Sequence, residues 1–481
     1  MTMRRPPARP PRACRCAALC ALLAAAGVGA ADLPPPLNGA LTAQIVPPAP
    51  PIPPPPPGQP GPTAPNVPTK QQGPPAGAPA AKKKPAEARP WYWHFTRWLD
   101  PKTAPFLPVP EIASDPNGGT TVGIIPTILV TDEQDDIRKI IAPDLIHNPY
   151  FGWGVHGRIY SYDSQDEQWS VVTNIQQRVE RGFDGEYQVG RTRQGPWSFN
   201  GSAIYNVDGT PRFYGIGNES LEIDQTNYTA QEYLLQSQLG YNITHALQLQ
   251  YTSRFEDVDV LPGTLSSVPS IETRFGSVLG EHTNKQVLNR LSLIYDTRDD
   301  IIIPSSGAEL VAYSGMASRN GFLNDSMYSE AGFDGRAFFP VADKSVIAAH
   351  MALRYLLTAH DVPFWALSSI GGADAMIGGN QLLRGYGDGR FYDRDSFSST
   401  VEFRRNVATF HAVATTVQIE LAPFIDVGRV FDRTSTLPFD QLHKVYGMGF
   451  RGLARPYVVG YVDVGYGTEG AAVFTGISYP F

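Results

Sequence analysis

The chain has 481 residues and a formal net charge of −7, with 44 prolines but only 3 cysteines. The acidic balance lacks the basic footprint that nucleic-acid binding requires, so we expect no nucleic-acid partner. The cysteines are Cys14, Cys16 and Cys20. The chain that follows them can therefore form no disulfide, thiol nucleophile or zinc–thiolate site.

Residues 1–30 have the composition of a secretory signal peptide. Arginines and no acidic residue open the segment, an apolar run extends from about Cys16 to Val28, and Val28-Gly29-Ala30 resembles a cleavage site. The run is shorter than the roughly 20 residues of a membrane-spanning helix. We expect this segment to direct export and to be removed, by the general secretory route in preference to the twin-arginine route.

Residues 31–90 form a proline-rich segment that is expected to be a disordered linker. Residues 32–90 contain 21 prolines. Proline lacks a backbone donor and favours an extended helix that builds no packed core. One interpretation is a tether with no specific partner, and the other is a docking segment for a periplasmic partner. In both cases residues 31–90 should be dispensable for folding.

Residues 91–118 form a short lead-in that begins with aromatic side chains, Trp91-Tyr92-Trp93-His94-Phe95. Tryptophan and tyrosine favour the membrane–water interface because one end of each ring is apolar and the other end can hydrogen-bond. An interfacial segment is therefore expected, with a plug-like strand inside the following domain as the alternative.

From residue 119 to residue 481 apolar and polar residues alternate. Between Val417 and Val427 the even positions include Gln418, Glu420 and Asp426, while most odd positions are apolar. An apolar outer face and a polar lumen suit a β-barrel in lipid, whereas a soluble sandwich would reverse the faces. The number and length of the strands favour an all-β, antiparallel transmembrane β-barrel over residues 119–481.

Seventeen segments carry this strand pattern. They are residues 120–131, 137–147, 152–162, 168–178, 183–193, 196–206, 227–242, 245–258, 285–297, 307–317, 327–340, 345–358, 398–407, 415–431, 443–453, 457–467 and 472–481. Single-chain bacterial barrels have even strand numbers, so either 120–131 or 137–147 is expected not to be a strand. The sequence thus predicts about sixteen strands.

The chain ends on an alternating aromatic pattern, with Ile477, Tyr479 and Phe481 at every second position. This ending resembles the carboxy-terminal signal of outer-membrane barrels. We expect a last strand whose aromatic side chains lie in the periplasmic girdle.

Five motifs in a fixed order point to one family. Leu383-Arg384-Gly385-Tyr386 precedes the carboxylates Glu402 and Asp426, and two earlier motifs occupy residues 212–218 and 295–299. The set resembles the BamA/TamA-type outer-membrane assembly-factor superfamily, also described as the bacterial surface antigen barrel family, over about residues 115–481.

The resemblance implies a loop that folds back into the lumen, where Arg384 meets the inward-facing Glu402 and Asp426. It implies that Gly385 permits a tight turn and that Tyr386 packs beside it. It further implies a multi-pass barrel in the bacterial outer membrane with a periplasmic N-terminus. Such a barrel is inserted by the host barrel-assembly machinery and contacts membrane lipid and lipopolysaccharide.

Members of the family that insert or secrete proteins carry POTRA domains before the barrel. Here that place holds the proline-rich segment, so we expect a member without POTRA domains that does not insert other barrels on its own.

No sequence pattern points to catalysis. Gly447-Met448-Gly449-Phe450-Arg451-Gly452 matches a dinucleotide-binding spacing but lies in a predicted strand with no helix after it. We expect no enzyme activity, no cofactor and no metal. Three functions stay open: action on the membrane or on partner proteins, a narrow channel or porin-like pore, and a structural barrel tethered to the periplasm by its proline-rich segment.

Overall fold

The computed structural model describes residues 107–131, 137–164, 166–280, 284–301, 303–319, 326–412, 415–432, 438–454, 457–476 and 479–481. The predicted signal peptide, the proline-rich segment, the aromatic residues 91–95 and Ile477 lie outside the described residues.

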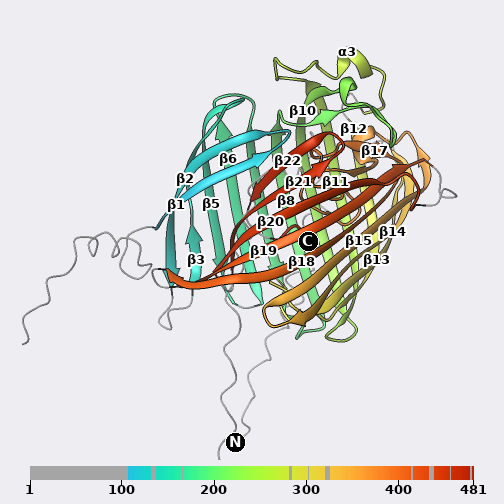
Figure 1. Ribbon diagram of the computed structural model, residues 1–481. Helices are drawn as coiled ribbons and strands as arrows, with labels where there is room; N and C mark the ends of the chain where they lie inside the picture. Colours follow the sequence, from blue (N-terminus) through green and yellow to red (C-terminus); the bar gives the residue numbers. More distant parts are fainter. Residues whose placement is uncertain are drawn as a thin grey trace, which may run out of the picture.

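The described residues form one large antiparallel sheet of 20 strands that curves into a barrel (Figure 1). A separate two-stranded ribbon is made by β16 (Ser368–Ile370) and β17 (Phe391–Asp393). The strands of the large sheet are β1 (Leu107–Asp115), β2 (Gly119–Thr131), β3 (Ile137–Ile141), β4 (Asp144–Asn148), β5 (Gly152–Tyr162), β6 (Glu167–Gln176), β7 (Arg181–Val189), β8 (Trp197–Asp208), β9 (Arg212–Phe213), β10 (Thr226–Asn242), β11 (Leu247–Pro262), β12 (Asn284–Asp296), β13 (Gly307–Ala317), β14 (Met327–Ala342), β15 (Ser345–His360), β18 (Asp395–Ala412), β19 (Thr415–Phe431), β20 (His443–Ala454), β21 (Tyr457–Gly467) and β22 (Gly470–Gly476).

Within the described ranges the barrel wall has 18 strands. Two pairs of segments that each occupy one place in the wall account for the difference from the sheet. The short β3 and β4 both lie between β2 and β5, and β8 and the two-residue β9 both pair with β10. The prediction of about sixteen strands is therefore close but not exact. Each of the seventeen predicted segments overlaps a strand of the wall, including 120–131 and 137–147, although the described strand in 472–481 ends at Gly476. One strand of the wall was missed, together with the short strands β9, β16 and β17.

The missed strand is β1, which falls inside the predicted lead-in of residues 91–118. It contains Pro108 and Pro110, and proline weakens a strand pattern because it cannot donate to the ladder. Pro108 lies opposite Pro126 of β2. Two prolines can face each other without losing ladder bonds only at a non-hydrogen-bonded pair. Pro108 and Pro110 therefore have no N–H to donate on the side of β1 that faces away from β2.

The barrel closes where β1 meets β22, and the described part of this seam is short. Ser114 pairs with Thr475, and the Thr475 hydroxyl donates to the Ile112 carbonyl at 3.1 Å. Elsewhere neighbouring strands pair over most of their lengths, as in the nine residue pairs between β1 and β2.

The barrel has an apolar outer face and a polar lumen, as the alternation predicts. On β12, for example, Leu291 and Leu293 are 51% and 45% exposed, whereas Arg290 and Ser292, which alternate with them, are buried. Exposed apolar residues recur on the outer faces of the other strands, and buried charged residues line the interior.

The two ends of the barrel differ in the length of their connections. At one end the connections include residues 209–225, 263–280 and 361–394, and at the other end they include the short turns 243–246 and 343–344. The long loops hold the short helices η1 (Glu222–Asp224), α3 (Glu272–Phe275) and η2 (Phe364–Ala366). None of the helices among the described residues is long and apolar enough to cross a membrane.

Candidate functional site: a charged lock in the barrel lumen

The longest loop, residues 361–394, folds back into the lumen and is closed at its base by the β16–β17 ribbon. Directly after β16, Gly371 has a φ of +136°, and a Cβ there would meet the Gly387 carbonyl oxygen at 2.2 Å. A glycine is therefore required where the two arms of the loop approach each other. The predicted motif, residues 383–386, lies at the inner end of this loop.

Arg384 is completely buried and bonds three carboxylates of the barrel wall. Its Nε and Nη2 donate to Asp426 at 3.0 and 2.7 Å, and its backbone N–H also donates to Asp426 at 3.0 Å. Its Nη1 donates to Glu402 at 2.5 Å and to Asp463 at 2.7 Å. The guanidinium also lies 3.5 Å from the centroid of the Phe424 ring. Burial lowers the pKa of Arg384, but Asp426 and Glu402 raise it well above its ordinary value.

Glu402 is the centre of this charged cluster because it binds three arginines. Besides Arg384 it accepts from Arg451, at 2.8 and 2.9 Å, and from Arg404 at 2.8 Å. Three members of this cluster were not predicted from the sequence, namely Asp463, Arg451 and Arg404. The alternation of apolar and polar residues along their strands could have placed them in the lumen. Paired charges of this kind are tolerated in a buried site because each one is hydrogen-bonded.

The other motif residues pack around Arg384. Leu383 and Tyr386 are buried, and the Tyr386 hydroxyl lies 2.8 Å from the Thr468 hydroxyl. A Cβ on Gly385 would lie 2.7 Å from Val445 and 2.8 Å from the backbone nitrogen of Gly467. Gly385 therefore allows the loop to approach the wall closely. It also lies in a tight turn, as the resemblance implied, in which the Tyr386 N–H donates to the Leu383 carbonyl at 3.1 Å.

A second ion cluster holds the outer part of the loop. Glu330 of β14 binds Arg290 of β12 at 2.8 Å and Arg354 of β15 at 3.0 Å. Arg290 also donates to the Ile377 carbonyl, and Arg354 to the carbonyls of Leu367 and Ala366, so each arginine ties the loop to the wall.

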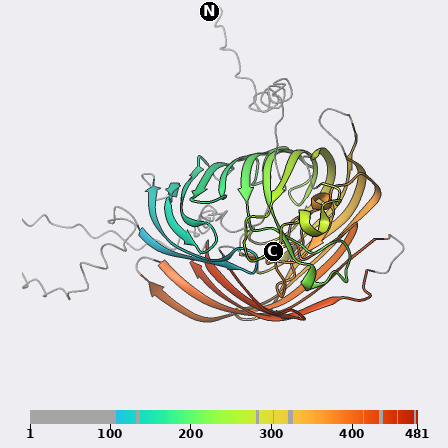
Figure 2. The ribbon, with the colours of Figure 1, turned by 90° about the horizontal axis from the view of Figure 1, so that it is seen from above.

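The predicted carboxy-terminal residues do not lie where the sequence placed them. Ile477 is outside the described residues, but Tyr479 and Phe481 lie in the lumen and not in an outer aromatic girdle. The Phe481 ring stacks on the inward His350 ring, with centroids 5.3 Å apart. Figure 2 accordingly shows the C-terminus inside the ring of strands. The chain end turns inward because His350 stacks on Phe481 and Arg404 lies over the Tyr479 ring, contacts that lipid cannot provide.

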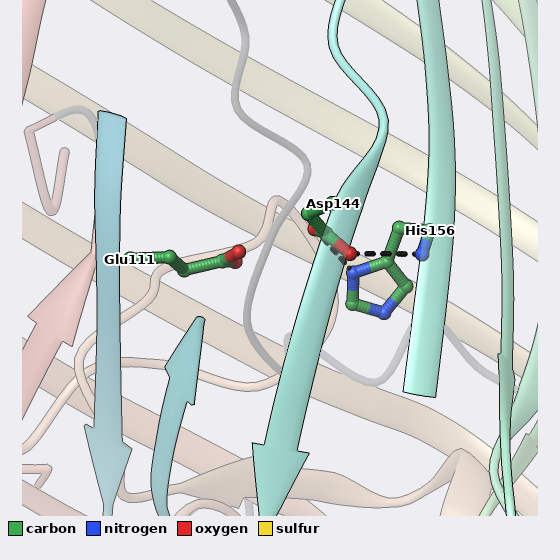
Figure 3. A group of neighbouring side chains, drawn as sticks. All are labelled: Glu111, Asp144 and His156. Atoms are coloured by element: carbon green, nitrogen blue, oxygen red, sulfur yellow. Dashed lines mark hydrogen bonds and ion pairs between the residues drawn. The ribbon is translucent and has the colours of Figure 1, made fainter. Parts of the chain in front are cut away.

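A further cluster gathers Glu111 of β1, Asp144 of β4 and His156 of β5 (Figure 3), with possible ligand atoms within 4.8 Å of one another. Asp144 lies 2.7 Å from His156 Nδ1. Arg158 binds Asp144 and lies 3.5 Å from Glu111. Because this guanidinium already neutralises the carboxylates, the cluster is an ion-pair network that would repel a divalent cation, and we assign no metal to it.

The loop leaves part of the lumen open. A cavity of about 800 Å³ lies between the inner faces of β5–β8, the loop and the seam. Ser114, Thr475 and Gly476 of the seam are among its lining residues. Its wall is rich in acidic side chains, which are Asp115, Glu180, Asp184, Glu186, Asp208, Glu232, Asp374 and Asp388.

Comparison with known proteins identifies the family. The sequence profile of the Omp85 superfamily domain matches residues 168–453. Among solved structures, the chain is similar to BamA from Haemophilus ducreyi lacking POTRA domains 1–3, with 12% identity, coverage of 74% of this chain and 75% of that chain, and a TM-score of 0.47. It is also similar to CdiB from Escherichia coli, with 8% identity, coverage of 76% and 62%, and a TM-score of 0.41. No curated protein matches the chain. The profile spans more than half of the residues, and the family predicted from the ordered motifs is confirmed: the chain belongs to the Omp85 superfamily of outer-membrane β-barrel proteins.

Proposed function

We propose that this barrel acts on the surrounding membrane and on partner proteins by opening at the seam between β1 and β22, and that it is not a catalyst. The observation that supports this proposal is the short pairing between the two strands of the seam. In the described part of the chain β1 and β22 share one residue pair, whereas β21 and β22 share seven. A pair of strands with few ladder bonds separates at lower cost than its neighbours.

Two features of β1 support this role for the seam. Pro108 and Pro110 have no N–H to offer to β22, so a longer ladder would lack donors. The lumen cavity reaches Ser114 and Thr475. Opening the seam would therefore connect a water-filled chamber directly with the bilayer and expose unpaired strand edges to lipid or to another chain.

The loop lengths support an orientation in the membrane. Outer-membrane barrels have short periplasmic turns and longer extracellular loops. In this orientation the start of β1 lies at the periplasmic end, so the proline-rich segment would extend into the periplasm and meet any partner there. Lipid and lipopolysaccharide would contact the outer face.

A narrow channel is the second candidate, because a cavity of about 800 Å³ lies in the lumen. Its acidic wall would favour cations. The loop held by Arg384 occupies the rest of the lumen, which favours seam opening over steady conduction.

The test is a disulfide across the seam. All cysteines of the chain lie in the predicted signal peptide, so Ser114→Cys with Thr475→Cys would be the only thiols of the exported protein. In liposomes, the reduced protein should speed the transfer of fluorescent lipid between leaflets, read by dithionite quenching, and oxidation should abolish this effect.

The matched control is Ser237→Cys with Ser253→Cys, a pair facing each other across β10 and β11. Oxidation of this pair should leave lipid transfer unchanged. Equal lipid transfer by the oxidised and reduced seam pair would contradict the proposal, and large single-channel steps that survive oxidation would favour the channel.

A further inference from the structure

The last residues of the chain occupy a site built for them inside the barrel. Phe481 is 7% exposed and packs with Phe338, Ala348 and Leu382. His350, whose ring stacks on Phe481, is held from its other side by Asp334 at 3.1 Å. The terminal aromatic ring is therefore enclosed by strands β14 and β15 and by the loop residue Leu382.

Tyr479 lies over two arginines of the same lumen wall. The guanidinium of Arg404 is 4.0 Å from the Tyr479 ring centroid, and that of Arg451 is 5.1 Å away. The Tyr479 hydroxyl donates to the carboxylate of Glu420 at 3.2 Å. Ile303, in the turn between β12 and β13, packs on the same residue.

Arg404 is the centre of this site. Its Nε donates to Glu402, while its Nη1 and Nη2 have no hydrogen-bond partner among the described residues. Its guanidinium is instead surrounded by the rings of Tyr479, Phe481 and Phe338, at 4.0, 5.0 and 5.5 Å. A desolvated guanidinium without further acceptors is stabilised by such ring faces.

The alternation of β22 shows that these contacts, and not the strand pattern, decide where the chain ends. Ala472 and Phe474 face the lumen, whereas Val473 faces outward. Continued alternation would place the odd-numbered Tyr479 and Phe481 outward, beside lipid. Both instead lie inside the lumen. They therefore do not extend the ladder along the part of β1 that precedes Ser114.

The same residues also hold the Arg384 loop. Arg404 and Arg451 bind Glu402, and Glu402 binds Arg384. Leu382, two residues before Arg384, contacts Phe481. The loop and the chain end thus share one charged centre and one apolar contact.

We propose that Tyr479 and Phe481 form an internal latch: they occupy an arginine-lined aromatic site and hold the Arg384 loop in the lumen. The latch couples the loop to the strand end at the seam. Release of the chain end loosens the loop, and release of the loop frees the chain end.

The test uses a thiol buried beneath the loop. Ser398 of β18 is 1% exposed, and its hydroxyl has no hydrogen-bond partner among the described residues, so Ser398→Cys removes no bond. In this background, Phe481→Ala should raise the rate of maleimide labelling of the folded protein by about tenfold or more, because labelling follows the fraction of open loop.

Two controls separate release of the latch from general loosening. Phe403→Ala makes the same chemical change on β18, but its side chain is 38% exposed on the outer face, so labelling should stay at the starting rate. A second reporter, Ala142→Cys, is buried against Tyr160 and Tyr162 of β5, two residues that line the cavity left open by the loop. Its labelling should not change with Phe481→Ala.

Folding is checked by the heat-dependent gel mobility of unboiled samples. If Phe481→Ala does not fold, Phe481→Leu keeps an apolar side chain without a ring and should raise Ser398→Cys labelling by a smaller factor. Equal labelling in the Phe481 and Phe403 variants, or an equal rise at both reporters, would overturn the latch.

Discussion

At the scale of single residues, the lumen is organised by carboxylates that each satisfy a different number of arginines. Glu402 binds three of them. Among the described residues Arg384 is the one cation bonded to Asp426, whose other side-chain donor is Thr400 at 2.8 Å. Removing Arg384 should therefore leave Asp426 without a cation, while Glu402 keeps two. A buried charge left without a partner is strongly destabilising.

We expect Arg384→Ala to destabilise the barrel by about 3–5 kcal/mol, the usual cost of breaking a buried ion pair from one side. Adding Asp426→Asn should recover part of this loss, since the carboxylate without a partner is then neutral. The measurement is the thermal midpoint of the heat-dependent gel shift. Arg405→Ala serves as control and should change little, because Arg405 is an exposed arginine on β18, the strand that carries Glu402. Additive losses in the double variant would refute the assignment.

A second residue-scale prediction concerns pH. Burial, and then the charge of Asp115, raise the pKa of the loop residue Asp374 to about 6. Burial and Asp374 likewise raise the pKa of Asp388. The folded loop therefore takes up protons that the unfolded chain does not bind, so its stability should increase as the pH falls through about 6.

Asp374→Asn should raise the thermal midpoint at pH 7.5 and reduce the difference between pH 5 and pH 7.5. Asp343→Asn, in an exposed turn at the other end of the barrel, should preserve the wild-type difference. An unchanged pH dependence in Asp374→Asn would show that the loop carboxyls do not control it.

The sequence was informative for some of these residues and silent for others. Arg384, Glu402 and Asp426 could be named because the ordered motifs and the period-two pattern placed all three in the lumen. Asp463, Arg404 and Arg451 carried the same alternation, but pairing between strands 12 to 79 residues apart depends on register. The inward position of Phe481 could not be predicted, since its partners come from β15 and β18.

At the scale of elements, glycine and proline decide where strands end and pair. The long strands from residue 152 onward were predictable because apolar and polar residues alternate over most of their length. Pro108 and Pro110 obscured β1, and Pro143 separates β3 from β4. Each of these prolines removes a ladder donor, so the same residues that weaken the sequence pattern also weaken the wall beside the seam.

The turn between β12 and β13 offers an element-scale test. Gly307 has a φ of +91°, and a Cβ there would lie 2.2 Å from the Thr297 carbonyl oxygen. Gly307→Ala should destabilise the barrel by at least the roughly 1–2 kcal/mol that a left-handed conformation costs. Gly452→Ala, where nothing lies within 4 Å, should be tolerated. Thermal midpoints of the two variants decide the point, and equal midpoints would show that the turn adapts.

At the scale of the whole molecule, the lumen is filled on one side. The loop and the chain end occupy the half bounded by β12–β20, through the Arg384 and Glu330 clusters and the Arg404 site. The other half, along β5–β8, holds the cavity of about 800 Å³ that reaches the seam. The barrel is thus neither fully plugged nor open, and under the proposed function the same loop would control both transport along the axis and opening at the seam.

This asymmetry predicts the electrical behaviour of the protein in a planar bilayer. The wild-type barrel should give small, irregular current steps, because the Arg384 loop and the chain end occupy one half of the lumen. Arg384→Ala should increase both the size and the frequency of the steps, since the loop loses its bonds to Asp426 and Asp463, and the acidic wall should make the current cation-selective. Arg405→Ala should behave like the wild type. Large, uniform steps from the wild-type protein would show that the loop does not obstruct the lumen, and would make the channel its main function.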